Sequence, residues 1–186
     1  MLGLGNSLIS NNRVNLHFSY YSDFTSDDNG WTKSSSFHNG TPTITPNQGT
    51  GDAADGTGWL KIVYGADQRN FPFSEDGGIE REMILSPDSF KAGDDIVISY
   101  KIKLIHNGVD DHWDGTDNVD IFIFGVDNAL VHEAVPLNTT KTYSNVGKII
   151  NPTINRKVKF RFTTATDKPK AGATWYLKDF SIQVFR

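Results

Sequence analysis

The sequence predicts an all-β fold, an antiparallel sandwich, and three observations support this prediction. Apolar and polar residues alternate with a period of two in several segments of the 186-residue chain, which is the pattern of a strand with one buried face. Connectors rich in Gly, Pro, Asn and Asp separate these segments, as turn geometry requires. No segment shows a helical period beyond one or two turns. Short strands joined by turns favour a sandwich or barrel.

The clearest predicted strand covers residues 95–105, DIVISYKIKLI, where apolar side chains alternate with polar ones. The same alternation predicts strands at residues 58–65 (GWLKIVYG), 156–162 (RKVKFRF) and 175–185 (WYLKDFSIQVF). Residues 119–126, VDIFIFGV, are apolar at successive positions, which is typical of a central strand covered on both faces. The charged segment GIEREMIL, residues 78–85, fits a short edge strand or a helical turn. The acidic stretch DDNG, residues 27–30, predicts a turn, because Asn-Gly and Asp-Gly pairs favour positive φ.

Composition limits the function classes. Hydrophobic residues make up 37% of the chain, which is enough for one domain with a packed core. Cysteine is absent, so disulfides, thiolate metal sites and a cysteine nucleophile are excluded. The net charge is -4 and no basic block occurs. We therefore expect no nucleic-acid partner and no membrane partner, since anionic surfaces are bound by clustered Lys and Arg and no apolar run approaches the roughly 20 residues of a membrane-spanning helix.

The order of these pieces resembles a known family. The segments that carry the resemblance are, in order, Asp23-Phe24, Gly30-Trp31, Gly93 with the strand from Ile96 to Leu104, and the aromatic-x-x-acid-aromatic strand from Tyr176 to Phe180. This order resembles the carbohydrate-binding-module type of β-jelly roll, the galactose-binding-like group found appended to glycoside hydrolases. The resemblance implies a jelly-roll domain over residues 18–186, with residues 1–17 as an N-terminal arm. It implies the fold more than the ligand, because the same sandwich hosts many functions.

The first residues, MLGLGNSLIS, resemble the beginnings of small structural proteins of tailed bacteriophages. This second resemblance implies a non-enzymatic structural protein of a virion, either a capsid auxiliary or decoration protein or a fibre-associated one. The chain would be made in the host cytoplasm and exposed on the particle surface, and its partners would be other virion proteins and further copies of itself. In this hypothesis the arm docks on a neighbour through its apolar residues Leu2, Leu4, Leu8 and Ile9.

Two acids are calcium candidates through the first resemblance. In that jelly-roll group, acids at the places of Asp23 and Asp179 help to hold a structural calcium ion, with loop carbonyls completing the six to eight oxygen ligands. Asp179 also interrupts a predicted strand, where a buried and unpaired carboxylate would be costly. The alternative is that both acids are solvated residues at strand ends. Calcium is the one cofactor that the sequence raises.

The densest polar segment is DDHWDGTD, residues 110–117. Its side chains Asp111, His112 and Asp114 can bind a metal or the hydroxyls of a sugar, and Trp113 can stack on a sugar ring. The alternative is an exposed loop with Asp-Gly turns, in which Trp113 caps the edge of the sandwich or lies in a subunit contact.

Three further tryptophans adjoin predicted strands. Strict alternation places Trp59 opposite Leu60, and Trp175 opposite Tyr176. Both tryptophans are therefore predicted to face outward, unless a bulge reverses the parity. Exposed aromatic residues mark interfaces or ligand sites, so Trp59 and Trp175 join Trp113 as candidate sugar platforms. Trp31 is expected to anchor the edge of the sandwich instead.

No enzyme motif is found in the sequence. It contains no Gly-x-Ser-x-Gly elbow, no phosphate loop and no His-Glu-x-x-His motif, and nothing singles out the pair of carboxylates that a glycosidase needs. The first hypothesis is therefore a non-enzymatic virion protein that acts through protein contacts, with weak adhesion to cell-surface glycans. The alternative is a soluble carbohydrate-binding module with a structural calcium ion.

Overall fold

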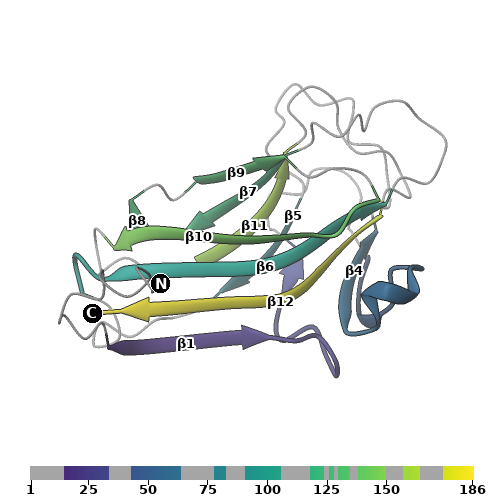
Figure 1. The fold of residues 1–186 in the computed structure, drawn as a ribbon, viewed down its shortest axis with the longest axis horizontal. Coiled ribbons are helices and arrows are strands. Elements are labelled where there is room, and N and C mark those ends of the chain that lie inside the picture. Colours follow the sequence, from purple (N-terminus) through teal and green to yellow (C-terminus); the bar gives the residue numbers. More distant parts are fainter. Residues whose placement is uncertain are drawn as a thin grey trace, which may run out of the picture.

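In the computed structural model the chain forms two antiparallel β-sheets that pack face to face (Figure 1). The structure describes residues 15–33, 43–63, 78–82, 91–105, 118–123, 126–127, 130–134, 138–149, 157–163 and 174–186. Within these ranges, sheet A contains β1 (Leu16–Ser22), β3 (Thr43–Gln48), β4 (Trp59–Val63), β6 (Asp95–Ile105), β8 (Val126–Asp127), β10 (Lys141–Ile149) and β12 (Thr174–Phe185). Sheet B contains β2 (Thr32–Lys33), β5 (Gly78–Glu82), β7 (Asn118–Ile123), β9 (Leu130–Ala134) and β11 (Lys157–Thr163).

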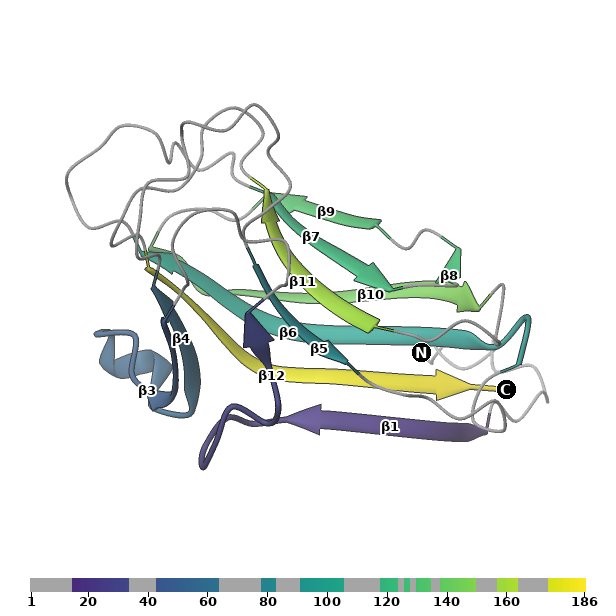
Figure 2. The same cartoon turned by 180° about the vertical axis from the view of Figure 1, so that it is seen from behind.

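The strand order of sheet A is β3-β4-β12-β6-β10-β8, and β1 also pairs with β12. Strand β12 is thus flanked by β6 on one side, and on the other by β4 along its first half and β1 along its second half. The order of sheet B is β2-β5-β11-β7-β9. Sheet B lies behind sheet A in Figure 1 and in front of it in Figure 2. A short 3₁₀ helix, η1 (Ala53–Asp55), links β3 to β4 beside the end of sheet A.

The core lies between the sheets and follows from the alternation in β6 and β12. Every second side chain of β6 from Ile96 to Leu104 is buried, and the exposed fraction of each is at most 3%. Trp31 lies at the edge of this core with its ring 4.8 Å from that of Phe180, and its Nε1 donates a hydrogen bond to Ser22 Oγ at 3.2 Å. Burying a large apolar side chain contributes roughly 1.5–3 kcal/mol, so the expectation that Trp31 anchors this edge is confirmed.

The predicted antiparallel sandwich is confirmed, and so are the strands expected around β4, β6, β7, β11 and β12. The first five residues of GIEREMIL, Gly78–Glu82, form strand β5 rather than a helical turn, and β5 lies between β2 and β11 rather than at an edge. The stretch DDNG is a turn, in which the N–H of Trp31 donates to the carbonyl of Asp28 at 2.9 Å and Gly30 has a φ of 73°.

Some elements differ from expectation. Strand β3 lies in a segment that the sequence assigned to a connector, and β9 and β10 were not predicted. Strand β1 begins at Leu16, which pairs with Phe185 of β12. The arm residues Leu2, Leu4, Leu8 and Ile9 lie outside the described residues, as do Asp111, His112, Trp113 and Asp114. Within the described ranges, no helix is long and apolar enough to cross a membrane.

Candidate functional site

A β-bulge in β12 shapes the outer face of sheet A. The register between β12 and β6 shifts between Lys178 and Ser181, and Asp179 has a φ of 51°, a left-handed conformation that Asp tolerates better than most residues. Leu177 before the bulge and Phe180 after it both face the core. The extra residue therefore leaves two consecutive polar side chains, Lys178 and Asp179, on the outer face.

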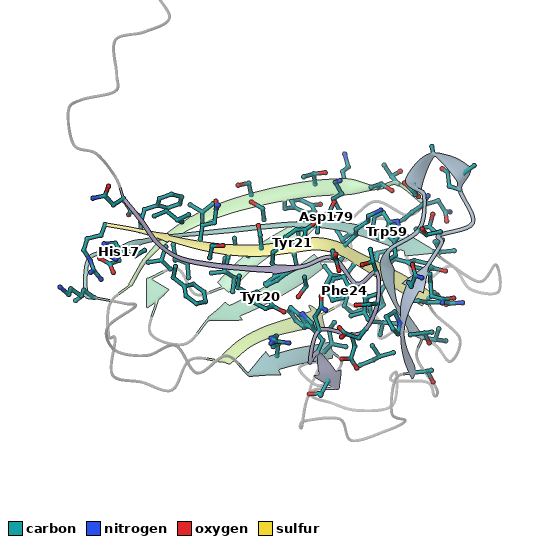
Figure 3. All side chains as sticks on the ribbon, turned by 90° about the horizontal axis from the view of Figure 1, so that it is seen from below. His17, Tyr20, Tyr21, Phe24, Trp59 and Asp179 are labelled. Carbon is teal, nitrogen blue, oxygen red and sulfur yellow. The ribbon has the colours of Figure 1, made fainter. Side chains whose placement is uncertain are left out.

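Tyr21, Asp179 and Lys101 form a hydrogen-bonded chain on this outer face. The hydroxyl of Tyr21 donates to Asp179 Oδ1 at 2.7 Å, and Lys101 Nζ lies 2.6 Å from Asp179 Oδ2. The three residues come from β1, β12 and β6, which are adjacent strands. Tyr21 is nevertheless 56% exposed. Figure 3 shows Tyr21 and Asp179 on one side of β1, and Tyr20 and Phe24 on the other. The chain holds an aromatic ring in place while leaving it accessible.

The contacts among these three side chains set the protonation states of Tyr21 and Asp179. The hydrogen bond to Asp179, together with partial burial, raises the pKa of Tyr21 to about 12. Burial alone would raise the pKa of Asp179, but hydrogen bonds from Lys101 and Tyr21 outweigh it and lower that pKa. At neutral pH Tyr21 is thus a hydroxyl donor and Asp179 is ionised and paired with Lys101. The negative charge of Asp179 is thus balanced by the positive charge of Lys101.

Small hydroxyl and amide side chains surround Tyr21, Asp179 and Lys101 on the outer face. Tyr21 pairs with Ser181, Ser181 with Ser99, and Ser99 with Ser144, so one cross-strand row runs over four strands. The neighbouring positions of the same face are Ser19, Gln183 and Thr142. Ser99 Oγ and Ser144 Oγ are 3.1 Å apart. We call these residues, with Tyr21, Asp179 and Lys101, the Tyr21 face. It combines one accessible ring and one ion pair with uncharged donors and acceptors.

A second polar cluster lies at the η1 end of the same face. Lys103 Nζ lies 2.7 Å from Asp55 Oδ2 and 3.4 Å from Asp52 Oδ2, and the Lys103 side chain is only 5% exposed. The hydroxyls of Thr50 and Thr140 also donate to the Asp55 carboxylate. Burial would raise the pKa of Asp55, but these hydrogen bonds lower it to about 2. The cluster holds the segment around η1 against sheet A, and this segment covers Trp59.

Trp59 is the residue covered in this way. Its parity was predicted correctly, since Leu60 and Ile62 face the core, but the expectation that it is exposed is wrong, because only 1% of it is accessible. Trp59 Nε1 donates to the carbonyl of Asp55 at 3.2 Å, and Lys178 Nζ lies 5.5 Å from the centre of its ring. A ring covered by η1 and a lysine offers no free face for a sugar.

The prediction that Trp175 faces outward is also wrong. It faces the core and is fully buried, whereas strict alternation back from Phe180 placed it outside. The bulge at Asp179 adds one residue to β12 and so reverses the parity of everything before it. Tyr176, and not Trp175, lies on the outer side, where its ring meets that of Trp59 at 6.5 Å.

The residues around Asp23 and Asp179 do not fit a calcium site. The Asp179 carboxylate is already held by the ammonium of Lys101 and the hydroxyl of Tyr21, and Asp23 Oδ1 accepts from the N–H of Thr25. No group of three or more His, Cys, Asp or Glu residues that could hold a metal occurs within the described part of the chain. A structural calcium ion needs six to eight oxygen ligands. Calcium binding at Asp23 and Asp179 stays a prediction, and the ion pair with Lys101 argues against it.

Sequence reasoning missed Tyr21 and Lys101. Tyr20 and Tyr21 are adjacent, so alternation places one of them outside, but it does not say which one. The signal that could have found them is the placement of Asp179, because a polar residue that interrupts an alternating strand marks a bulge. Its neighbours on the flanking strands are then the residues to inspect.

Comparison with solved structures supports the fold. The C-terminal family 22 carbohydrate-binding module of Clostridium thermocellum Xyn10B has a TM-score of 0.56 and 13% identity, with 89% of this chain and 91% of that chain covered. The CBM22-1–GH10 modules of the same enzyme, complexed with xylohexaose, also have a TM-score of 0.56 and 13% identity, covering 88% of this chain and 27% of that one. The CBM22-2 xylan-binding domain of Paenibacillus barcinonensis Xyn10C has a TM-score of 0.51 and 13% identity, with 88% and 97% covered.

At this identity the likeness establishes a carbohydrate-binding-module-like β-sandwich and no particular ligand. Comparison with models of known protein families finds no match. Comparison with curated proteins finds none either.

Proposed function

We propose that this chain is a non-catalytic module that binds a neutral polysaccharide on the Tyr21 face of sheet A. The observation that carries the proposal is an exposed aromatic ring fixed by the Tyr21–Asp179–Lys101 chain. An aromatic ring packs against the C–H groups of a sugar ring, while nearby hydroxyls, amides and paired charges bind its hydroxyl groups. The ring is held before the ligand arrives, which reduces the entropy lost on binding.

The chemistry of this face favours binding over catalysis. Glycoside hydrolysis needs two carboxyl groups, one of which has a raised pKa and acts as the acid. Asp179 is the carboxylate of the Tyr21 face, and its pKa is lowered by Lys101 and Tyr21. It suits the role of a hydrogen-bond acceptor that orients Tyr21. The similar folds of proteins that are named for carbohydrate or xylan binding support the same proposal.

Calorimetric titration with short soluble oligosaccharides tests the proposal, starting with xylohexaose because a structurally similar protein is complexed with it. We expect Tyr21→Ala to weaken binding at least about fivefold, since an aromatic contact contributes about 1 kcal/mol or more. Tyr21→Phe keeps the ring and loses the bond to Asp179, so it should fall between the wild type and Tyr21→Ala. Leu16→Ala, which shortens the other exposed apolar residue of β1, is the matched control and should bind normally.

Two outcomes would contradict the proposal. One is the absence of binding across a broad panel of neutral oligosaccharides and polysaccharides. The other is binding that survives Tyr21→Ala unchanged, which would place the sugar elsewhere on the molecule. Circular dichroism of each variant checks that its fold is kept.

The sequence also favours a role on a tailed-phage particle, and that role stays a prediction. It rests on the leader with Leu2, Leu4, Leu8 and Ile9, which lies outside the described residues. A glycan-binding module and a virion protein are compatible, because a module that adheres to host-surface glycans can be carried by a particle. Deleting residues 1–12 is expected to leave a folded chain that no longer joins its assembly. Mass spectrometry of purified particles measures that incorporation, and normal incorporation of the shortened chain would contradict the prediction.

A further inference from the structure

Strand β1 is a long, uncharged edge of sheet A. It pairs with β12 along one side, and no other strand within the described ranges pairs with it. Its seven residues, LHFSYYS, include no Lys, Arg, Asp, Glu or Pro. Figure 1 shows β1 at the margin of the sheet. An edge of this kind presents unpaired N–H and C=O groups to any strand that can reach them, and proteins normally protect such edges.

The other described edge strands carry Pro or charged residues. Strand β3 contains Pro46, which cannot donate a hydrogen bond to a neighbouring strand. Strand β10 pairs with β8 only at Lys148 and Ile149, and Lys141 lies at its other end. Strands β8 and β2 have two residues each. Strand β9 contains Glu133. Strand β1 is the described edge strand that carries neither Pro nor Lys, Arg, Asp or Glu, which favours it as the edge where a partner strand pairs.

The side chains of β1 also leave apolar surface uncovered. The two exposed large hydrophobic residues of the described chain, Leu16 and Tyr21, both lie on β1. On its other face, Phe18 and Tyr20 pack against the core cluster but are only partly buried. The margin of the core at β1 is therefore incompletely covered, and a strand added beside β1 would cover it on both faces.

We propose that β1 is the interface of a homodimer, in which the β1 strands of two copies pair antiparallel across a two-fold axis at Tyr20. Two polar residues at the ends of β1 favour a second copy as the occupant, because a ring N–H of His17 can donate a hydrogen bond to the carboxylate of Asp23. His17 is exposed near one end, and Asp23 follows the other end. An antiparallel pairing centred on residue 20 puts His17 of each copy opposite Asp23 of the other. The surface is thus complementary to itself, as a two-fold interface requires.

This pairing joins the two copies of sheet A into one continuous sheet. A two-fold axis normal to the sheet keeps both Tyr21 faces on the same side of it. If the Tyr21 face binds polysaccharide as proposed above, one long chain can contact both copies, and the second contact benefits from a high effective concentration. Dimerisation itself does not depend on that proposed function.

Molecular mass in solution tests the dimer without any ligand. We expect the full-length chain to show a concentration-dependent monomer–dimer equilibrium in sedimentation velocity and multi-angle light scattering. Ser19→Lys places a charge on the edge strand and is expected to weaken the dimer at least about tenfold. The matched control is Ser144→Lys, the same change on the same face of β10, three strands away in the sheet, and it should leave the equilibrium unchanged.

The register has its own test, because the chain contains no cysteine. Residues opposite each other in an antiparallel pair have Cα atoms about 4.5–5.5 Å apart, which suits a disulfide. Tyr20→Cys on the axis should therefore give a disulfide-linked dimer under mild oxidation, whereas Thr142→Cys on β10 should not. The proposal is overturned if the wild type stays monomeric up to millimolar concentration, or if Ser19→Lys dimerises as well as the wild type. A dimer that Tyr20→Cys does not cross-link overturns the register.

Discussion

Replacing Asp55 with Asn is expected to lower the free energy of unfolding by about 3 kcal/mol. The Lys103 side chain is 5% exposed and its ammonium lies 2.7 Å from the Asp55 carboxylate. Asn keeps the shape of the side chain and removes its charge, so a buried ammonium loses its main partner. Breaking a buried ion pair in this way costs about 3–5 kcal/mol. Asp52, at 3.4 Å from Lys103 Nζ and half-exposed, compensates in part and keeps the loss near the lower limit.

Urea denaturation followed by tryptophan fluorescence measures this loss. The midpoint should fall with an unchanged slope, and the melting temperature should drop by about 6–12 °C for a chain of this size. Asp179→Asn is the matched control, because it also removes an ion-paired carboxylate, but Lys101 is 41% exposed. Exposed pairs contribute at most about 1 kcal/mol, and Asn tolerates the left-handed backbone at this position. Equal losses in the two variants would refute the reasoning that the burial of Lys103 decides the cost.

Two further predictions concern pH and calcium. The pKa of Asp55 is lowered from 3.8 to about 2 in the folded chain, so its stabilisation is complete above the unfolded pKa near 4 and is lost as the pH falls towards 2. The free energy of unfolding should fall by about 2 kcal/mol over that range. The fall should be smaller in Asp55→Asn, and urea titrations at several pH values measure both. Neither calcium nor a chelator should shift the melting temperature by more than about 1 °C, because Lys101 already pairs with Asp179. A melting temperature that rises with calcium, and no longer rises in Asp23→Asn, would instead support a calcium site at Asp23 and Asp179.

The sandwich could be predicted from the sequence because alternation is a local signal. Every second residue from Ile96 to Leu104 is apolar, and β6 occupies those positions. Strand β3 was missed for the opposite reason. Its residues TITPNQ contain Pro and Asn and read as a connector, and it becomes a strand only through pairing with β4. Tertiary contacts override weak local preference in such edge strands.

The candidate site could be predicted only in part. Asp179 was recognised as an unusual residue, but its partners Lys101 and Tyr21 are 78 and 158 positions away in the chain. No local pattern links residues at such separations. The same applies to Lys103 and Asp55, whose pairing over 48 positions fixes the segment that covers Trp59. Burial of Trp59 therefore depends on a long-range ion pair, which parity alone could not reveal.

The bulge at Asp179 shapes the Tyr21 face, and its deletion tests this role directly. Asp179 is the extra residue of the bulge, so a β12 without it alternates regularly, and Leu177 and Phe180 on either side of Lys178 still face the core. The register with β6 becomes continuous, because Phe180 would lie opposite Tyr100, between the Lys178–Lys101 and Ser181–Ser99 pairs. What the deletion removes is the carboxylate that accepts from Tyr21 and pairs with Lys101.

We therefore expect the deletion variant to unfold cooperatively and to keep its near-ultraviolet circular dichroism, while Tyr21 loses the hydrogen bond that orients it. Asp179→Gly is the control, because it keeps the residue count and glycine accepts a φ of 51°. It should also remain folded and lose the same hydrogen bond. A deletion variant without cooperative thermal unfolding would mean that β12 needs the bulge to bury Trp175 and Phe180 on one face.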